Sequence, residues 1–367
     1  MHTLSVVMTN YNHARFLPGA LSAILLQSFQ PVEIIIIDDA STDHSAEVLS
    51  EFSKRSPNLK VIQNERNLGI IANGRRLFDL AIGDYVYWAA SDDKVLPGFF
   101  QKSMELLMRY PQAGLCSTLS VAVDEEGRYQ GLCRLPVISS TACFLNPKQF
   151  QQAFCDYGSW LQGVTTIYRK QAILDAGGFP PQLGAFVDGF MCEVLALRHG
   201  VCFIPEPLTA MRRMGEYSMS AGANLETMLE ITRQAESLMD STYRDIFAPD
   251  CRRSVRRQLV HWAGTGSWNE VRRQQEKFLS QSFPRLCPSQ SWIERTFLLA
   301  MQLFIRVQSF MVKCFFVGLV RRSPLVWLKF WVNYFLVWKK AKRIREEVLT
   351  VQDPPRAIET DYNLHGA

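Results

Sequence analysis

The first hundred residues alternate between short apolar runs and longer segments in which apolar and polar positions are mixed. The runs are residues 4–8, 33–37, 61–63 and 85–89, and their β-branched and aromatic side chains favour strands. Four consecutive isoleucines at 34–37 predict a strand buried on both faces, because neighbouring residues of a strand point to opposite sides. The segments between the runs place apolar residues at helical spacing. This alternation predicts a parallel sheet with crossover helices.

The pattern changes twice further along the chain. Residues 113–207 predict a mixed sheet with long loops, since short apolar runs persist there without regular helices between them. After about residue 222 the strand signals stop, and apolar positions recur at helical spacing. We therefore expect an α/β domain over residues 1–222 and an all-α region over residues 223–367.

Polar clusters follow three of the predicted strands, at residues 9–12, 38–43 and 91–93. In open α/β sheets, ligands bind outside the carboxyl ends of the strands. Two carboxylates beside a buried strand need partners, which the N–H groups of a uracil ring and the hydroxyls of a ribose would provide. The acidic pair at 92–93 suits a hard divalent cation, such as Mg²⁺ or Mn²⁺, bridging two phosphate oxygens.

Each cluster also has a simpler explanation. Ser41 or Thr42 is expected to cap the helix that follows, and the pair at 92–93 is compatible with a turn before Pro97. The three clusters occur in order at successive strand ends, which favours the interpretation as a ligand site.

In this order, the blocks resemble those of family-2 glycosyltransferases with the GT-A fold, over roughly the first 220 residues. The blocks are residues 5–12, 37–43, 67–69, 81–85 and 91–93. The resemblance implies that Thr9, Tyr11 and Asp39 hold the nucleoside of a nucleotide sugar. It also implies that Asp92 and Asp93 stand for the DxD-type element of the family, with Asp93 nearest the metal.

A second set of residues supports the resemblance. Gly177, Gly178 and Phe179, followed by Val187 and Asp188, are similar to the family's GGF…ED signature, whose last Asp is the catalytic base. Val187 departs from the signature and leaves Asp188 as the acidic residue of the pair. Such a carboxylate would deprotonate the acceptor hydroxyl as it attacks the anomeric carbon in an inverting transfer. Asp188 could equally cap the following helix, and the two roles are compatible.

Other positions depart from the family pattern. Arg75, or its neighbour Arg76, is expected to reach the diphosphate, although solvated surface arginines are the commoner case. Met214 stands where many relatives have a histidine, so a third protein ligand to the metal is not expected there, while Arg212 and Arg213 are available as anion contacts. The QxxRW block of processive synthases is missing, which favours transfer of a single sugar.

The C-terminal region is strongly basic. Its segment from residue 295 to 345 carries eleven Lys or Arg and no Asp or Glu, whereas the whole chain has a net charge of only +5. Polar residues of 296–320 form one stripe of a helix, and tryptophans and lysines follow at 325–340. Residues 292–346 therefore predict amphipathic helices lying on an anionic membrane surface. The alternative is a soluble bundle packed on the catalytic domain.

The cysteines and the first residues indicate where in the cell the protein works. The nine cysteines are odd in number and irregular in spacing, which favours reduced thiols, and the first residues resemble a strand rather than a secretory signal. We expect a cytoplasmic enzyme, peripheral on the inner face of the cell membrane, with no nucleic-acid partner.

The predicted function is metal-dependent, inverting, hexosyltransferase-type transfer of one sugar. The donor would be a nucleotide-diphosphate sugar, with UDP favoured, and the acceptor a hydroxyl of a glycan or lipid-linked molecule in cell-surface polysaccharide synthesis. One alternative is a catalytically inactive nucleotide-sugar-binding module of the same fold. A sugar-nucleotide pyrophosphorylase fits less well, because the turn after the first strand lacks the glycines of a phosphate loop.

Overall fold

The computed structural model describes residues 2–133, 135–213, 225–255 and 259. These residues fall into two compact units, which are described separately. The first unit contains the described residues up to 153 and from 160 to 213, and the second contains 154–159 and those from 225 onward. The boundary predicted near residue 222 and the amphipathic helices predicted at 292–346 lie outside the described residues, so both stay predictions.

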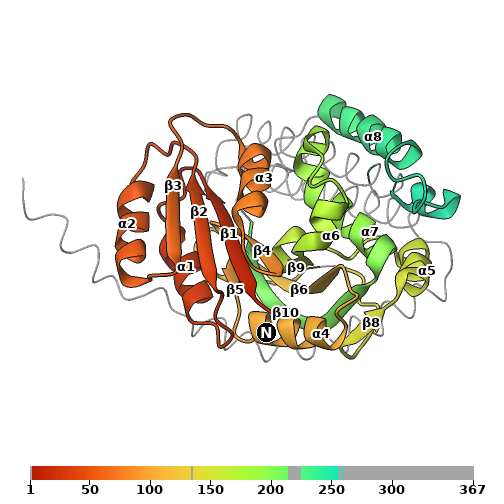
Figure 1. The fold of residues 1–367 in the computed structure, drawn as a ribbon, viewed down its shortest axis with the longest axis horizontal. Helices are drawn as coiled ribbons and strands as arrows, with labels where there is room; N and C mark the ends of the chain where they lie inside the picture. The colour runs from red at the N-terminus through yellow and green to blue at the C-terminus, as the bar shows by residue number, and fades with distance from the viewer. Residues whose placement is uncertain (1, 134, 214–224, 256–258, 260–367) are drawn as a thin grey trace, which may run out of the picture. The chain divides into compact units, whose positions relative to one another are not determined.

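Strands and helices alternate through the first hundred residues of the first unit and become less regular afterwards (Figure 1). In chain order they are β1 (Leu4–Asn10), α1 (Leu17–Leu25), β2 (Glu33–Asp38), α2 (Ser45–Arg55), β3 (Leu59–Gln63), α3 (Ile70–Leu80), β4 (Tyr85–Ala90), β5 (Lys94–Val95), α4 (Phe99–Arg109), β6 (Leu115–Val123), β7 (Tyr129–Leu132), β8 (Cys143–Leu145), α5 (Pro147–Tyr157), the 3-10 helix η1 (Gly163–Thr165), β9 (Thr166–Arg169), α6 (Lys170–Asp175), the 3-10 helix η2 (Pro181–Phe186), α7 (Val187–His199) and β10 (Val201–Arg212). The four strands predicted from the apolar runs are confirmed, each longer by one or two residues.

Within the described residues, ten strands form one sheet in the order β3-β2-β1-β4-β9-β6-β10-β5, with β7 beside β6 and β8 beside β10. The first four strands of the chain are parallel, as predicted, and so are β6 and β10. Strand β9 runs antiparallel to both β4 and β6 and joins the two halves. The chain moves from β1 toward β3 on one side and returns to β4 on the other, so a topological switch point lies between β1 and β4.

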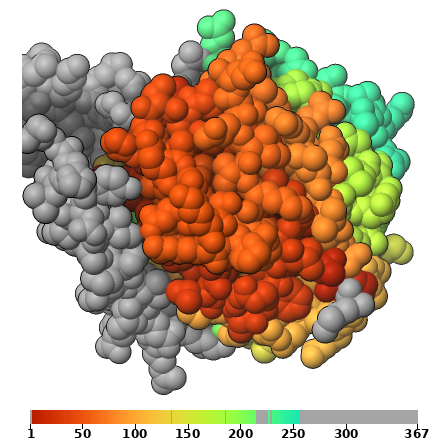
Figure 2. Space-filling model, turned by 60° about the vertical axis from the view of Figure 1, so that its left-hand side comes forward, coloured from red at the N-terminus to blue at the C-terminus, as the bar shows by residue number. Residues whose placement is uncertain are grey.

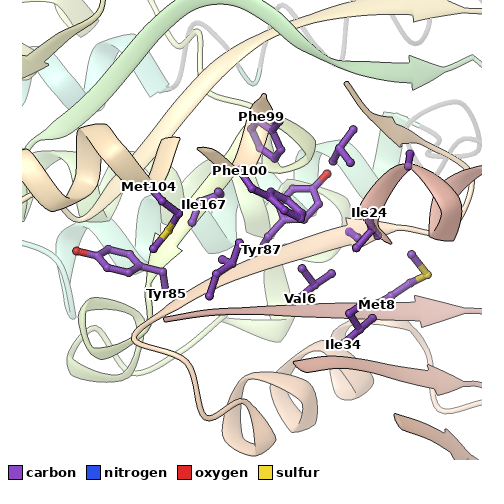
Figure 3. Packing of buried hydrophobic residues seen from close by; sticks show 14 of the residues in the cluster. Val6, Met8, Ile24, Ile34, Tyr85, Tyr87, Phe99, Phe100, Met104 and Ile167 are labelled. Carbon is purple, nitrogen blue, oxygen red and sulfur yellow. The ribbon is translucent and has the colours of Figure 1, made fainter. Parts of the chain in front are cut away.

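Both faces of the parallel half are covered. On one face, α1 and α4 pack on alternate strand residues, of which Figure 3 labels Val6, Met8, Ile34, Tyr85 and Tyr87 together with Ile24, Phe99, Phe100 and Met104. The other face meets α3, and Ile35 and Ile37 point to that side. All four isoleucines of β2 are at most 4% exposed, which confirms the two-sided burial and stabilises the fold by about 1.5–3 kcal/mol per side chain. In Figure 2, the N-terminal part of the chain, in red and orange, makes up most of the face turned to the viewer.

The start of α2 differs from the prediction. Neither Ser41 nor Thr42 caps this helix, which begins at Ser45 after His44. The carboxylate of Asp43 accepts a hydrogen bond from the Ser45 N–H at 3.0 Å. Ser41 and Thr42 instead bond to residues of the loop after β1, because the two loops lie side by side at the end of the sheet.

The described part of the second unit is helical. Helix α8 (Leu225–Asp240) is followed by turns and by a further helical segment at 249–255. Within α8 the buried residues Ile231, Ala235 and Met239 recur at every fourth position, which places them along one side of the helix, as expected for an apolar stripe. No helix in the part of the chain that the structure describes has the length and apolar character that crossing a membrane requires.

Candidate active site

The three polar clusters predicted at strand ends share one edge of the sheet. Strand β1 pairs with β2 and with β4, so that Thr9 lies opposite both Ile37 and Ala90. The residues that follow these positions therefore leave the sheet next to one another at the switch point. Thr9 is half-buried at the end of β1, whereas the Tyr11 side chain is 45% exposed in the turn beyond it.

Hydrogen bonds join the loop after β1 to the loop after β2. Asn10 Nδ2 and Ser41 Oγ both donate to Asp38 Oδ1, at 2.7 and 2.6 Å. Asn12 adds two more bonds to the loop after β2. Its N–H donates to Ser41 Oγ at 2.9 Å, and its Oδ1 accepts from the Thr42 N–H at 2.8 Å. Asp38 therefore has a structural role that holds the two loops as one body.

Two residues in these loops have left-handed backbone conformations. Asn12 has a φ of 55° and Ala40 a φ of 61°. An alanine in this region is strained by about 1–2 kcal/mol, because its Cβ crowds the following carbonyl oxygen. Such strain persists where surrounding contacts over-determine the backbone, as the cross-loop hydrogen bonds do here.

Asp39, a predicted nucleoside contact, is 3% exposed and holds the loop between β3 and α3. Its Oδ1 accepts from Asn64 Nδ2 at 2.8 Å and from the Leu68 N–H at 2.9 Å, and its Oδ2 accepts from the Gly69 N–H at 2.9 Å. Burial alone would raise the pKa of Asp39, but the hydrogen bonds from Leu68, Asn64, Asn73 and Gly69 outweigh it and lower that pKa. The carboxylate is thus ionised and rigidly held.

The two arginines of α3 have different surroundings. Arg76 Nη1 donates to Asn64 Oδ1 at 3.1 Å and so joins the network around Asp39. Arg75, the residue expected at the diphosphate, is exposed on the same helix, and its role stays a prediction.

Asp92 and Asp93 lie in the short connection between β4 and β5, and both are half-buried. The Arg212 N–H donates to Asp93 Oδ1 at 2.6 Å. Burial and the neighbouring charge of Asp92 raise the pKa of Asp93. Two close carboxylates that disfavour each other's charge are a donor set suited to a hard divalent cation, whose charge would relieve the repulsion.

The described residues contain no group of three or more His, Cys, Asp or Glu side chains that could hold a metal ion. A cation at Asp92 and Asp93 would therefore take its remaining ligands from phosphate oxygens and water, as is usual for Mg²⁺. Met214, where a third ligand is not expected, lies outside the described residues.

Asp188 is the second residue of α7 and is half-buried. Its Oδ1 accepts from the Gly189 N–H at 2.7 Å. Burial raises the pKa of Asp188, and backbone hydrogen bonds, including one from Gly163, oppose that rise only in part. The cap position belongs to Phe186, so the interpretation of Asp188 as the helix cap is wrong.

Two residues near Asp188 were not indicated by the sequence. Tyr87 of β4 is buried, and its hydroxyl donates to the Val164 carbonyl at 3.0 Å. Burial and the charge of Asp93 raise the pKa of Tyr87. Val164 directly follows Gly163, which packs against Asp188 so closely that a Cβ there would lie 2.2 Å from Asp188 Oδ2. Tyr87 therefore helps to hold the backbone against which the Asp188 carboxylate packs, and neither it nor Gly163 carries a local motif.

The sequence of the first unit matches a known family. Residues 5–167 match the family model described as Glycosyl transferase family 2. Among similar proteins, the uncharacterized protein MT1568 of Mycobacterium tuberculosis is 26% identical over 57% of this chain and 66% of its own length. TuaG of Bacillus subtilis, named provisionally as a teichuronic acid biosynthesis glycosyltransferase, is 30% identical over 29% of this chain. This match spans 42% of TuaG, so both relatives are covered over less than two thirds of their length.

Solved structures share the fold. Residues 1–349 of Staphylococcus aureus TarS, in complex with UDP-GlcNAc, align with a TM-score of 0.56 at 17% identity, over 93% of this chain and 92% of that one. The mannosyltransferase PcManGT from Pyrobaculum calidifontis, in complex with GDP-Man and Mn²⁺, aligns with a TM-score of 0.50 at 14% identity, over 86% and 85% of the two chains. The strand order, the polar edge and the match over residues 5–167 agree: this segment is similar to glycosyl transferase family 2, and the fold is that of the GT-A structures.

Proposed function

We propose that this protein is an inverting transferase that moves one hexosyl unit from a nucleotide-diphosphate sugar, with UDP favoured, to an acceptor hydroxyl in cell-surface polysaccharide synthesis. The observation that carries the proposal is the meeting of three polar clusters at one edge of the sheet. The residues after β1, β2 and β4 leave the sheet next to one another, which brings Tyr11, Asp39 and the Asp92–Asp93 pair to the switch point. Asp188 at the start of α7, with its carboxylate close to Gly163, is the candidate base.

On the donor side, the nucleoside would lie over the joined loops after β1 and β2. Thr9 and the exposed Tyr11 ring stand at this edge, and a tyrosine face suits a stacked base. Asp39 holds the loop before α3 beside this edge through hydrogen bonds from Asn64, Leu68 and Gly69, and its negative charge would favour a ring N–H there.

For the diphosphate, Asp92 and Asp93 would hold a divalent cation, Mg²⁺ or Mn²⁺, with Asp93 nearest to it. When bound, the cation would neutralise the charge that develops on the departing diphosphate. Asp93 is oriented for this role by the Arg212 N–H on its Oδ1, which leaves Oδ2 for the metal. Arg75 would add a positive charge from α3.

On the acceptor side, Asp188 would act as general base. Its raised pKa makes it a stronger base than an ordinary surface carboxylate. The acceptor hydroxyl would give its proton to Asp188 as its oxygen attacks the anomeric carbon, and the bond to the diphosphate breaks on the opposite side. One base and one displacement invert the anomeric centre.

The main rival is a catalytically inactive nucleotide-sugar-binding module. Its strongest support in the sequence is Val187, which replaces the first acidic residue of the family signature. In the structure Val187 is 4% exposed and belongs to the apolar core, so packing explains this departure without a loss of chemistry. The pyrophosphorylase alternative lacks a glycine-rich phosphate loop between β1 and α1.

The cellular setting is also a proposal. The name of TuaG, a teichuronic acid biosynthesis glycosyltransferase, favours a glycan or lipid-linked acceptor at the cell surface. The basic amphipathic segment at 292–346 favours a peripheral position on the inner face of the membrane, where anionic lipid is found.

The decisive experiment measures donor turnover by the purified full chain with Mn²⁺, using UDP-, GDP- and dTDP-sugars. Hydrolysis of one donor is expected, and Asp188→Asn should lower its rate by about 10²–10⁴-fold while nucleotide binding stays intact. Asp79→Asn, at an exposed position of α3, serves as the matched control. Wild-type turnover by Asp188→Asn would refute the assignment of the base. Binding of a donor that the unaltered protein never turns over would favour the inactive module.

A further inference from the structure

Arg212, the last residue of β10, contacts three separate segments of the first unit. Its N–H donates to Asp93 Oδ1 at 2.6 Å, and its Nε donates to the Asp92 carbonyl at 2.9 Å. Its Nη1 donates to the carbonyls of Asp124 and Glu125, at 3.0 and 2.5 Å, in the turn between β6 and β7. The guanidinium carbon also lies 4.6 Å from the centroid of the Phe16 ring, in the loop before α1.

These contacts change what Arg212 can do. The sequence suggested an anion contact, but the guanidinium is directed to three main-chain carbonyls and an aromatic face. Simultaneous donation from Nε and Nη1, with the ring against the flat face of the group, requires a planar fork. A lysine carries its three N–H donors on one nitrogen and lacks the second, separated donor nitrogen and the flat face that span the Asp92 carbonyl, the 124–125 turn and Phe16.

The connection between β4 and β5, which Arg212 contacts, requires support from other segments. Asp92 and Asp93 repel each other, and β5 beyond them is only two residues long. That strand pairs with β10, where Ala210 lies opposite Lys94. On the other side of the pair, Ser91 Oγ is 2.7 Å from His13 Nδ1. The acidic connection is therefore tied at Ser91 by the loop after β1, and at Asp92 and Asp93 by the end of β10.

We propose that Arg212 is a positioning residue that preorganises Asp92 and Asp93 to receive the divalent cation; this inference rests on the proposed function. It acts through the main-chain carbonyl of Asp92 and the carboxylate of Asp93 rather than by touching the donor. Residues that orient metal ligands typically change metal affinity by roughly 10–100-fold when replaced. Arg212 is then the reason why two carboxylates without a third protein ligand among the described residues form a usable site.

The test measures Mn²⁺ binding to the full chain in the presence of UDP, by electron paramagnetic resonance of free Mn²⁺. Arg212→Lys should weaken Mn²⁺ binding roughly 10–100-fold. Arg213→Lys, an exposed arginine next in the chain, is the control and should bind Mn²⁺ as the unaltered protein does. Excess Mn²⁺ should restore donor turnover in Arg212→Lys, because a positioning residue changes the metal concentration required and not the chemical step.

The outcomes separate this inference from the proposed function. If Asp93→Ala binds Mn²⁺ like the unaltered protein, the proposed metal site itself is wrong. If Asp93→Ala loses Mn²⁺ but Arg212→Lys keeps full affinity, only the role of Arg212 is overturned. Should Arg212→Lys unfold in a thermal melt, Phe16→Leu removes the aromatic face under the guanidinium and leaves the arginine in place. A several-fold loss of Mn²⁺ affinity in a folded Phe16→Leu protein is expected, and unchanged affinity there would overturn the inference.

Discussion

A methyl group at position 163 offers a specific test of the assigned base. Gly163 begins η1, and a Cβ built on it would lie 2.2 Å from Asp188 Oδ2 and 3.0 Å from both Cβ and Cγ of Asp188. Ordinary contacts of a Cβ begin at 3.4 Å, so the carboxylate oxygen would have to move by about 1 Å. Because this oxygen is the end of a side chain, it can rotate away, and the backbone can stay nearly in place.

The expected effect is therefore larger on catalysis than on folding. Overpacking of this size costs about 1–3 kcal/mol of stability. A misplacement of about 1 Å in a reacting group can lower the rate by roughly 10²-fold. Gly163→Ala should thus reduce kcat by about two orders of magnitude, while the dissociation constant of UDP stays unchanged because the proposed nucleoside contacts are at the ends of β1 and β2.

The assay combines initial rates at saturating donor, titration calorimetry of UDP and a thermal melt. Gly189→Ala is the matched control, since Gly189 is the neighbour of Asp188 and its Cβ would meet only Phe186, at 3.5 Å. This control should keep wild-type kcat. A wild-type kcat in a folded Gly163→Ala protein, or an equal loss in both variants, would refute the reasoning that the position of Asp188 limits turnover.

Three further predictions follow from the charges of the chain. Because burial raises the pKa of Asp188, and the base must be ionised, kcat should fall as pH drops through a value above the ordinary carboxyl range; full activity at pH 4 would contradict this. Asp39→Asn should lower the free energy of unfolding at pH 7 by about 1.5–3 kcal/mol, since hydrogen bonds to a charged group are lost. The lowered pKa of Asp39 means that this difference is present above its ordinary value of 3.8 and fades as pH falls below it, which chemical denaturation at pH 7 and pH 3 can check. The full chain should float with anionic but not with neutral vesicles, and truncation at about residue 285 should abolish flotation, because each basic residue near the lipid contributes about 1 kcal/mol.

The sequence alone determined the elements of the parallel half and the edge at which the site lies. Local periodicity decides whether a segment forms a strand, and four isoleucines in a row require cover on both faces wherever the strand is placed. Carboxyl ends of neighbouring parallel strands meet at one edge, so Tyr11, Asp39 and Asp92 could be assigned to a common region before any coordinates were known. These inferences depend on contacts between residues that are close in the sequence, or on contacts that the geometry of the sheet fixes.

Only the tertiary structure decided how individual side chains are used. Ser41 bonds to Asn12 rather than capping a helix, and Asp39 accepts three hydrogen bonds from the loop before α3. Arg212 binds carbonyls that lie 87 to 120 positions away in the chain, and Gly163 is required by a carboxylate 25 residues later. Such pairings depend on where β9 and β10 enter the sheet, and no local pattern of residues encodes that position, because a side chain bonds to whatever partner the completed fold places within about 3 Å.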